Sequence, residues 1–119
     1  MFIRRLLMSV ITASACATSQ ADDFDISGNV KTVIERYCAE CHGGGSAEGN
    51  VQLDALSRLD HDERLELLNK AQEQLFFRRM PPDDAEQPTD SDHQALAEML
   101  ASELKRFGAS KLEEKLRRP

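Results

Sequence analysis

Apolar side chains recur at helical spacing in three stretches of this 119-residue chain. The first stretch covers residues 29–38, where the apolar positions fall at i, i+3, i+4, i+7 and i+8, the pattern of an amphipathic helix. These positions are Val30, Val33, Ile34, Tyr37 and Cys38. The breaker Gly43-Gly44-Gly45-Ser46 follows soon after and predicts a loop.

The second stretch predicts a helix that begins after Asp60. Asp60 and Glu63 have the spacing of a capping box, with Asp in place of Ser or Thr. We expect Pro81 and Pro82 to end this helix, because proline cannot continue the backbone hydrogen bonds. The predicted apolar face consists of Leu65, Leu68, Ala71, Leu75 and Phe76.

A third helix is predicted between Thr89 or Asp90, either of which can cap it, and Gly108, which stands at the C′ position. Its apolar face consists of Leu96, Met99, Leu100, Leu104 and Phe107. Three amphipathic helices without a strand pattern predict an all-α fold. We expect residues 22–28 to be a flexible lead-in, residues 29–108 to form one domain, and residues 109–119 to be a charged tail or linker.

Residues 1–21 have the organisation of a secretory signal peptide. Arg4 and Arg5 precede a short apolar segment, and Ser19-Gln20-Ala21 supplies small residues for cleavage after Ala21. Cleavage at Ala15-Cys16-Ala17, lipoprotein processing at Cys16 and an ordinary N-terminal helix are the alternatives. The signal peptide predicts export to the periplasm.

The formal net charge of −6 becomes −8 when residues 1–21 are removed, because they contain two arginines and no acid. An acidic chain is unlike a nucleic-acid-binding protein, which usually presents a basic face. No run of apolar residues reaches the ~18 needed for a membrane span, so none is expected after signal cleavage. The chain has no Trp, one Tyr and five Phe. So few aromatic residues give a small core, which a bound group could complete.

The string Cys38-Ala39-Glu40-Cys41-His42 is the C-x-x-C-H motif of c-type haem attachment. In such a motif two thiols bond to the two vinyl groups of one haem, and the adjacent His42 lies in position to bind the iron. The predicted cofactor is therefore one covalently attached haem c. A redox-active C-x-x-C, half of a zinc site and a structural disulfide remain as alternatives.

Met80 is the preferred candidate for the second axial ligand of the iron. It precedes Pro81, which disfavours the helical conformation at Met80 and frees its side chain from the helical face. His61, His93 and Met99 are weaker candidates, because the histidines lie in the first turns of helices and Met99 lies on an apolar face. A thioether and an imidazole leave no open site on the iron, which favours electron transfer over catalysis.

The chain from about residue 30 to 107 resembles the small class I cytochrome c domains, most closely those of planctomycete cytochrome-type proteins. The resemblance is carried by Tyr37–His42, Gly49–Asp54, Arg79–Pro82 and Pro88 with the helix after it. It implies a class I cytochrome c-like fold with the N- and C-terminal helices packed together. It also implies that Cys38 and Cys41 bind haem, that His42 is the proximal ligand and that Met80 is the distal ligand.

The sequence departs from that family in two respects. Phe107 stands where such domains often carry a Trp near the end of the last helix. No Pro lies between His42 and Met80, where many class I cytochromes use a Pro carbonyl to orient the proximal His. The partner that orients His42 is therefore not identified from the sequence.

These observations predict a periplasmic monohaem c-type cytochrome that carries single electrons to or from a redox partner protein and is not itself an enzyme. One alternative is an N-terminal haem-bearing module of a larger periplasmic oxidoreductase, since the family's domain often heads a longer polypeptide. Another alternative is a five-coordinate haem binder or peroxidase-like protein, which would bind added ligands without displacing Met80.

Overall fold

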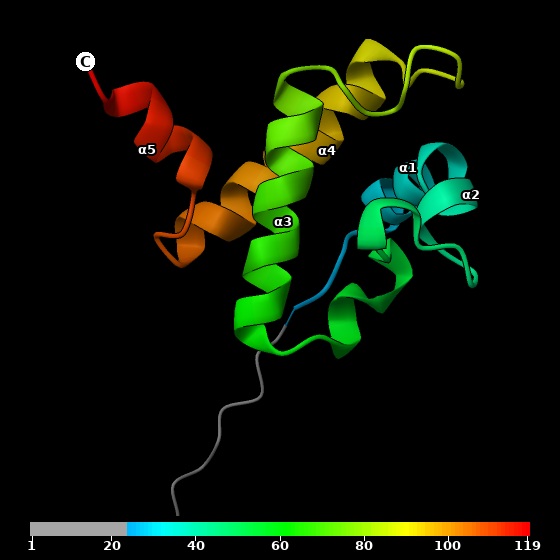
Figure 1. Cartoon of the computed structure of the whole chain (residues 1–119), viewed down its shortest axis with the longest axis horizontal. Coiled ribbons are helices and arrows are strands. Elements are labelled where there is room, and N and C mark those ends of the chain that lie inside the picture. The colour runs from blue at the N-terminus through cyan, green and yellow to red at the C-terminus, as the bar shows by residue number, and fades with distance from the viewer. Residues whose placement is uncertain (1–23) are drawn as a thin grey trace, which may run out of the picture.

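The computed structural model describes residues 24–119, and these residues form helices and no strands (Figure 1). The all-α prediction is therefore confirmed for this part of the chain. The predicted signal peptide lies outside the described residues. In chain order, the elements are α1 (Gly28–Tyr37), α2 (Ala39–His42), the 3-10 helices η1 (Glu48–Asn50) and η2 (Leu53–Arg58), α3 (His61–Phe76), α4 (Asp90–Arg106) and α5 (Lys111–Arg117).

The three longest helices, α1, α3 and α4, correspond to the three predicted from the apolar pattern. Asp60 caps α3 as expected, since its side chain accepts a hydrogen bond from the Glu63 N–H at 2.9 Å. At α4 the cap is Thr89, whose hydroxyl accepts from the Asp92 N–H at 3.1 Å. Each cap satisfies a backbone donor that has no partner within its helix.

The end of α3 differs from the expectation. The helix stops at Phe76, before the two prolines, because Arg78 adopts a left-handed conformation with φ of 52°. The Arg78 N–H then bonds to the Leu75 carbonyl, and the Arg79 N–H bonds to the Gln74 carbonyl. This pair of bonds is a Schellman motif, which usually has glycine in the place of Arg78. At α4 the same motif forms with Gly108, as the sequence predicted.

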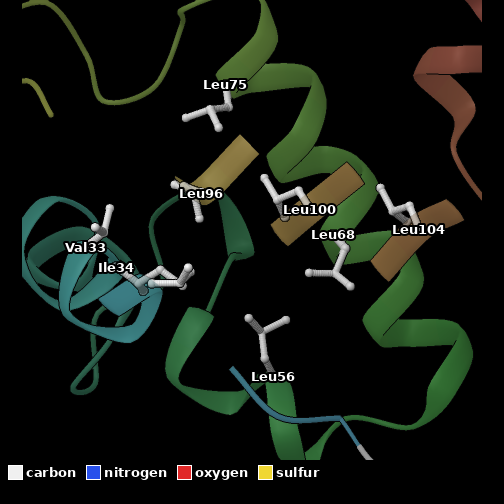
Figure 2. Close-up of a cluster of buried hydrophobic side chains, with 9 residues drawn as sticks. Val33, Ile34, Leu56, Leu68, Leu75, Leu96, Leu100 and Leu104 are labelled. Atoms are coloured by element: carbon white, nitrogen blue, oxygen red, sulfur yellow. The ribbon is translucent and has the colours of Figure 1, made fainter. Parts of the chain in front are cut away.

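The core lies where α1, α3, α4 and η2 meet (Figure 2). Helices α3 and α4 pack side by side and run in opposite directions, because His93 of α4 contacts Leu75 of α3 while Phe107, just after α4, contacts His61 of α3. Helix α1 packs against α4, as the class I resemblance implies. The buried apolar residues of this core are Val30, Val33, Ile34, Leu56, Leu68, Leu75, Leu96, Leu100 and Leu104. Burying each such side chain contributes about 1.5–3 kcal/mol.

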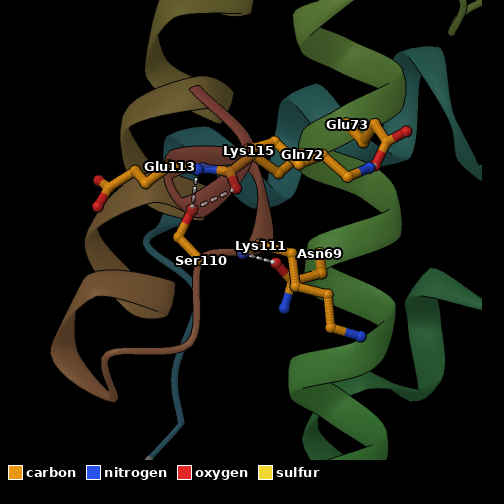
Figure 3. A network of polar contacts seen from close by, with 7 residues as sticks. All are labelled: Asn69, Gln72, Glu73, Ser110, Lys111, Glu113 and Lys115. Carbon is orange, nitrogen blue, oxygen red and sulfur yellow. Dashed lines mark hydrogen bonds and ion pairs between the residues drawn. The ribbon is translucent and has the colours of Figure 1, made fainter. Parts of the chain in front are cut away.

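Residues 111–117 of the charged C-terminal segment form α5, which packs against α3 (Figure 3). Asn69 of α3 donates to the Ala109 carbonyl at 2.9 Å and accepts from the Lys111 N–H at 2.9 Å. The Ser110 hydroxyl donates to Gln72 at 3.0 Å, and Leu112 is buried. The C-terminal segment is therefore attached to α3 by buried polar and apolar contacts. Within residues 24–119, no helix is both long and apolar enough to cross a membrane.

Candidate cofactor site

Cys38, Cys41 and His42 lie on one turn of helix at the junction of α1 and α2. Cys38 has non-helical angles and separates the two helices, but its N–H still bonds to the Ile34 carbonyl at 2.9 Å. The His42 N–H in turn bonds to the Cys38 carbonyl at 3.0 Å. Positions i, i+3 and i+4 share one face of a helix, so the two thiols and the imidazole are grouped together.

Both thiols are half-buried and unoxidised, with no disulfide between them. Cys38 packs against the core, and this burial raises the pKa of its thiol. The pKa of the Cys41 thiol is raised by burial and then by the carboxylate of Glu48. Redox-active C-x-x-C sites depend on a lowered pKa, because the thiolate is the nucleophile. The local electrostatics therefore give the redox alternative no support.

The imidazole of His42 has a backbone partner, which the sequence did not identify. Its Nδ1 lies 3.2 Å from the carbonyl oxygen of Val51. In the tautomer with the proton on Nδ1, the ring donates to this carbonyl and keeps the lone pair of Nε2 for a metal. The carbonyl of Val51 therefore makes the contact with His42 that a Pro carbonyl makes in many class I cytochromes.

The loop that carries Val51 is closed by a second contact. The Gly44 N–H donates to Oδ2 of Asp54 at 3.2 Å. Residues 42–44 are therefore joined to residues 51–54 by two hydrogen bonds, this one and the bond between His42 and Val51. Gly49 and Asn50, just before Val51, have left-handed φ angles of 63° and 58°. Asp54 lies in the sequence stretch that resembles the family, but the sequence alone assigns it no role. The partner of His42 is the backbone carbonyl of Val51, which no residue type in the sequence can indicate.

A cavity of about 390 Å³ opens beside His42 and Ala39. Its apolar walls come from the residues before α1, from α1 itself and from η2, namely Phe24, Ile26, Ile34, Leu53 and Leu56. Cys38, Cys41 and Met80 do not line it. The imidazole thus lines a cavity whose walls are partly apolar and partly charged, whereas the thiols and Met80 lie outside these walls.

Met80 lies beyond the end of α3 and is 43% exposed. Phe76 and Phe77 are also exposed, at 52% and 48%, and the guanidinium of Arg79 lies 4.9 Å from the centre of the Phe77 ring. Single exposed apolar residues are ordinary, but a group of large ones indicates a surface that something else covers. The predicted distal ligand is therefore an exposed side chain that follows two exposed phenylalanines at the end of α3.

The segment after Met80 contacts the helix that carries the cysteines. Arg36 forms an ion pair with Glu86 at 2.6 Å, and the Tyr37 hydroxyl donates to Asp92 at 3.1 Å. The charge of Asp84 also contributes to the raised pKa of Cys41. Residues 81–92 are thus placed beside the C-x-x-C-H turn, although they are far from it in the sequence.

The other candidate ligands have different surroundings. The ring of His61 meets the ring of Phe107 edge-on at 4.4 Å, and His93 Nε2 lies 3.3 Å from the Leu75 carbonyl. Met99 is partly buried against the core, as its place on the apolar face of α4 predicted. Among the residues that the structure describes, no group of three or more His, Cys, Asp and Glu side chains could hold a metal ion. The zinc alternative therefore has no ligand set in residues 24–119.

Residues 38–84, from the first cysteine to the segment after Met80, match the family model of planctomycete cytochrome C. A search of curated proteins finds no significant match, and a search of solved structures finds none either.

Proposed function

We propose that the protein is a monohaem c-type cytochrome that carries single electrons in a periplasmic redox chain, and the match of residues 38–84 to the family model of planctomycete cytochrome C supports this proposal. The observation that carries this proposal is the grouping of Cys38, Cys41 and His42 on one helical turn. The Nδ1 atom of His42 bonds to Val51, which leaves Nε2 for iron.

The residues present fit a haem c. Two thiols are what covalent attachment requires, His42 would bind the iron, and the thioether of Met80 would be a second protein ligand. The exposed Phe76 and Phe77 give an apolar surface that a flat hydrophobic group can cover. The small number of aromatic residues agrees with a core that a cofactor completes.

The chain's own residues have separate tasks in this proposal. Cys38 and Cys41 hold the haem by thioether bonds, and His42 binds the iron with a ring orientation set by the Val51 carbonyl. Haem c, when bound, supplies the one-electron couple of its iron.

With both His42 and Met80 bound to the iron, no position would be left for a small ligand, and the protein would act as an electron carrier. A thioether opposite an imidazole also raises the reduction potential relative to two imidazoles. The redox partner is a second protein, and the acidic net charge of −6 favours a basic docking surface on it. The sequence of residues 1–21 supports a periplasmic location.

The exposure of Met80 favours one second candidate, a five-coordinate haem protein that binds small ligands. The two functions differ in how the ferric protein responds to added imidazole. A protein without a methionine ligand binds imidazole equally well when Met80 is replaced by alanine. A six-coordinate electron carrier binds it more tightly after that replacement.

The proposal is tested first by covalent attachment. The protein is expressed with its N-terminal segment and a c-type maturation system, denatured, and examined by optical spectroscopy. We expect haem to stay on the chain, to shift its α band in Cys38→Ala or Cys41→Ala, and to be lost in the double variant. His93→Ala is the matched control for His42→Ala and keeps a normal spectrum. A chain without covalent haem, despite working maturation, overturns the proposal.

A further inference from the structure

We propose that Arg36 and Tyr37 are positioning residues that hold the segment 81–92 against the end of α1 and so keep Met80 available to the iron. The inference rests on the proposed function, because it assumes that Met80 is the distal ligand.

Two contacts join the segment to consecutive residues of α1. Arg36 Nη2 lies 2.6 Å from Glu86 Oε1, across 50 residues of sequence. The hydroxyl of Tyr37 donates to Asp92 Oδ2 at 3.1 Å, across 55 residues. Tyr37 is directly followed by Cys38, so both contacts attach the segment beside the haem-binding turn. Figure 1 shows the connection between α3 and α4 at the same side of the molecule as α1 and α2.

The two contacts support one another. The guanidinium of Arg36 lies 5.1 Å from the centre of the Tyr37 ring, a cation–π arrangement that holds both side chains together. Asp92 is itself fixed, because its N–H is bound by the capping hydroxyl of Thr89 at the start of α4. The Tyr37 contact is half-buried, whereas Arg36 and Glu86 are each 60% exposed.

The segment is stiff enough to transmit these contacts toward Met80. The side-chain amide of Gln87 lies within hydrogen-bond distance of the carbonyls of Pro81, Pro82 and Ala85, at 3.3, 2.8 and 3.2 Å. Pro81, the neighbour of Met80, is buried. A turn closed in this way fixes the distance between Glu86 and Met80, so release of Glu86 and Asp92 also loosens Met80.

The two contacts of the segment differ in their exposure to solvent. An exposed ion pair is weakened by salt, and a half-buried hydrogen bond is weakened less. We therefore expect part of the positioning to depend on ionic strength.

The test uses the purified ferric holoprotein and measures its affinity for added imidazole, which competes with Met80. The variants are Arg36→Gln, Tyr37→Phe, their combination and Glu86→Gln. Glu98→Gln is the control for Glu86→Gln, since it removes the same charge and the partner of Glu98, Gln94, lies within α4. In the exchanged variant Arg36→Glu with Glu86→Arg, the ion pair is restored with opposite polarity. Amide hydrogen exchange of residues 81–92 gives a second, independent readout.

We expect the combined variant to bind imidazole about threefold to tenfold more tightly and to exchange its 81–92 amides faster by a similar factor. The exchanged variant returns toward the original values, and added salt reduces the difference between Arg36→Gln and the unmodified protein. Unchanged hydrogen exchange in the combined variant overturns the inference. Faster exchange with unchanged imidazole affinity overturns the positioning of Met80. If Met80→Ala itself leaves the imidazole affinity unchanged, then Met80 is not the distal ligand and the proposed function is wrong on this point. The inference then fails because its premise fails, and this outcome differs from an unchanged hydrogen exchange in the combined variant.

Discussion

The imidazole of His42 and the carbonyl of Val51 meet at 3.2 Å across a loop of eight intervening residues. The loop contains two pairs of consecutive residues with positive φ angles, namely Gly44 with Gly45 and Gly49 with Asn50. Because Val51 directly follows the second pair, the direction of its carbonyl depends on the φ angles of Gly49 and Asn50. The orientation of the proposed proximal ligand is therefore set by a turn and not by another side chain.

The substitution Gly49→Ala tests this dependence. Alanine at φ of 63° costs about 1 kcal/mol, although open space surrounds the position. We expect the urea midpoint of the holoprotein to fall accordingly and the ligand-sensitive absorption of the ferric protein to change. Gly28→Ala is the matched control, since Gly28 also has open space, has no left-handed φ and lies at the start of α1. Equal losses in the two variants would contradict the role of the turn.

The features predicted correctly from the sequence are those whose signal is local. The N-cap bonds of Asp60 and Thr89 and the Schellman motif at Gly108 each depend on a few neighbouring residues. The grouping of Cys38, Cys41 and His42 likewise follows from a single helical turn. Such signals can be read without knowing the rest of the fold.

Other features escape prediction because their partners are distant or are backbone atoms. The Arg36–Glu86 pair joins residues 50 positions apart, and any of several acids could have met Arg36. The carbonyl of Val51 has the same chemistry as every other carbonyl in the chain. Phe76 was expected on the apolar face of its helix but is 52% exposed, because the apolar spacing cannot show where the packing surface ends.

The end of α3 gives a second prediction. Arg78 holds a left-handed conformation at the C′ position, where glycine carries no steric penalty. We expect Arg78→Gly to raise the free energy of unfolding by up to about 1 kcal/mol. Arg79→Gly is the control, because the φ angle of Arg79 is not left-handed. The guanidinium of Arg79 lies over the ring of Phe77. A loss of stability in Arg78→Gly, measured by thermal unfolding of the holoprotein, would contradict the account of this helix end.

The attachment of α5 depends on Asn69. Its side chain is buried and bonds to the carbonyls of Leu65 and Ala109 and to the N–H of Lys111. We expect Asn69→Ala to cost about 1–3 kcal/mol, because buried backbone groups lose their partner. The measurement is urea unfolding together with hydrogen exchange of residues 111–117. Lys70→Ala, at an exposed neighbouring position, is the control and should change neither readout.

A loss of stability in Asn69→Ala without faster exchange in α5 would place its effect within α3 alone. The same comparison separates two interpretations of the C-terminal segment. A tail that only touches the domain loses protection in α5 at little cost to the whole fold. A helix that belongs to the domain transmits its loss to α3, as the buried Leu112 and Ser110 indicate.

The ion pair between Glu73 and Lys115 makes the attachment of α5 depend on pH. The ammonium of Lys115, 2.7 Å from Glu73, lowers the pKa of that carboxyl below its usual value of about 4.3. A carboxyl with a lowered pKa in the folded state stabilises the fold above its unfolded pKa, and this contribution is lost as the pH falls through the folded value. We therefore expect the protection of the α5 amides to decrease below about pH 4 and to be less pH-dependent in Glu73→Gln. Glu66→Gln is the control, because it removes the same charge from α3. The partner of Glu66 is Lys70 on the same helix, so the Glu66→Gln variant should keep the pH dependence of the α5 amides. Identical profiles for Glu73→Gln and the unmodified chain would show that another group controls the contact.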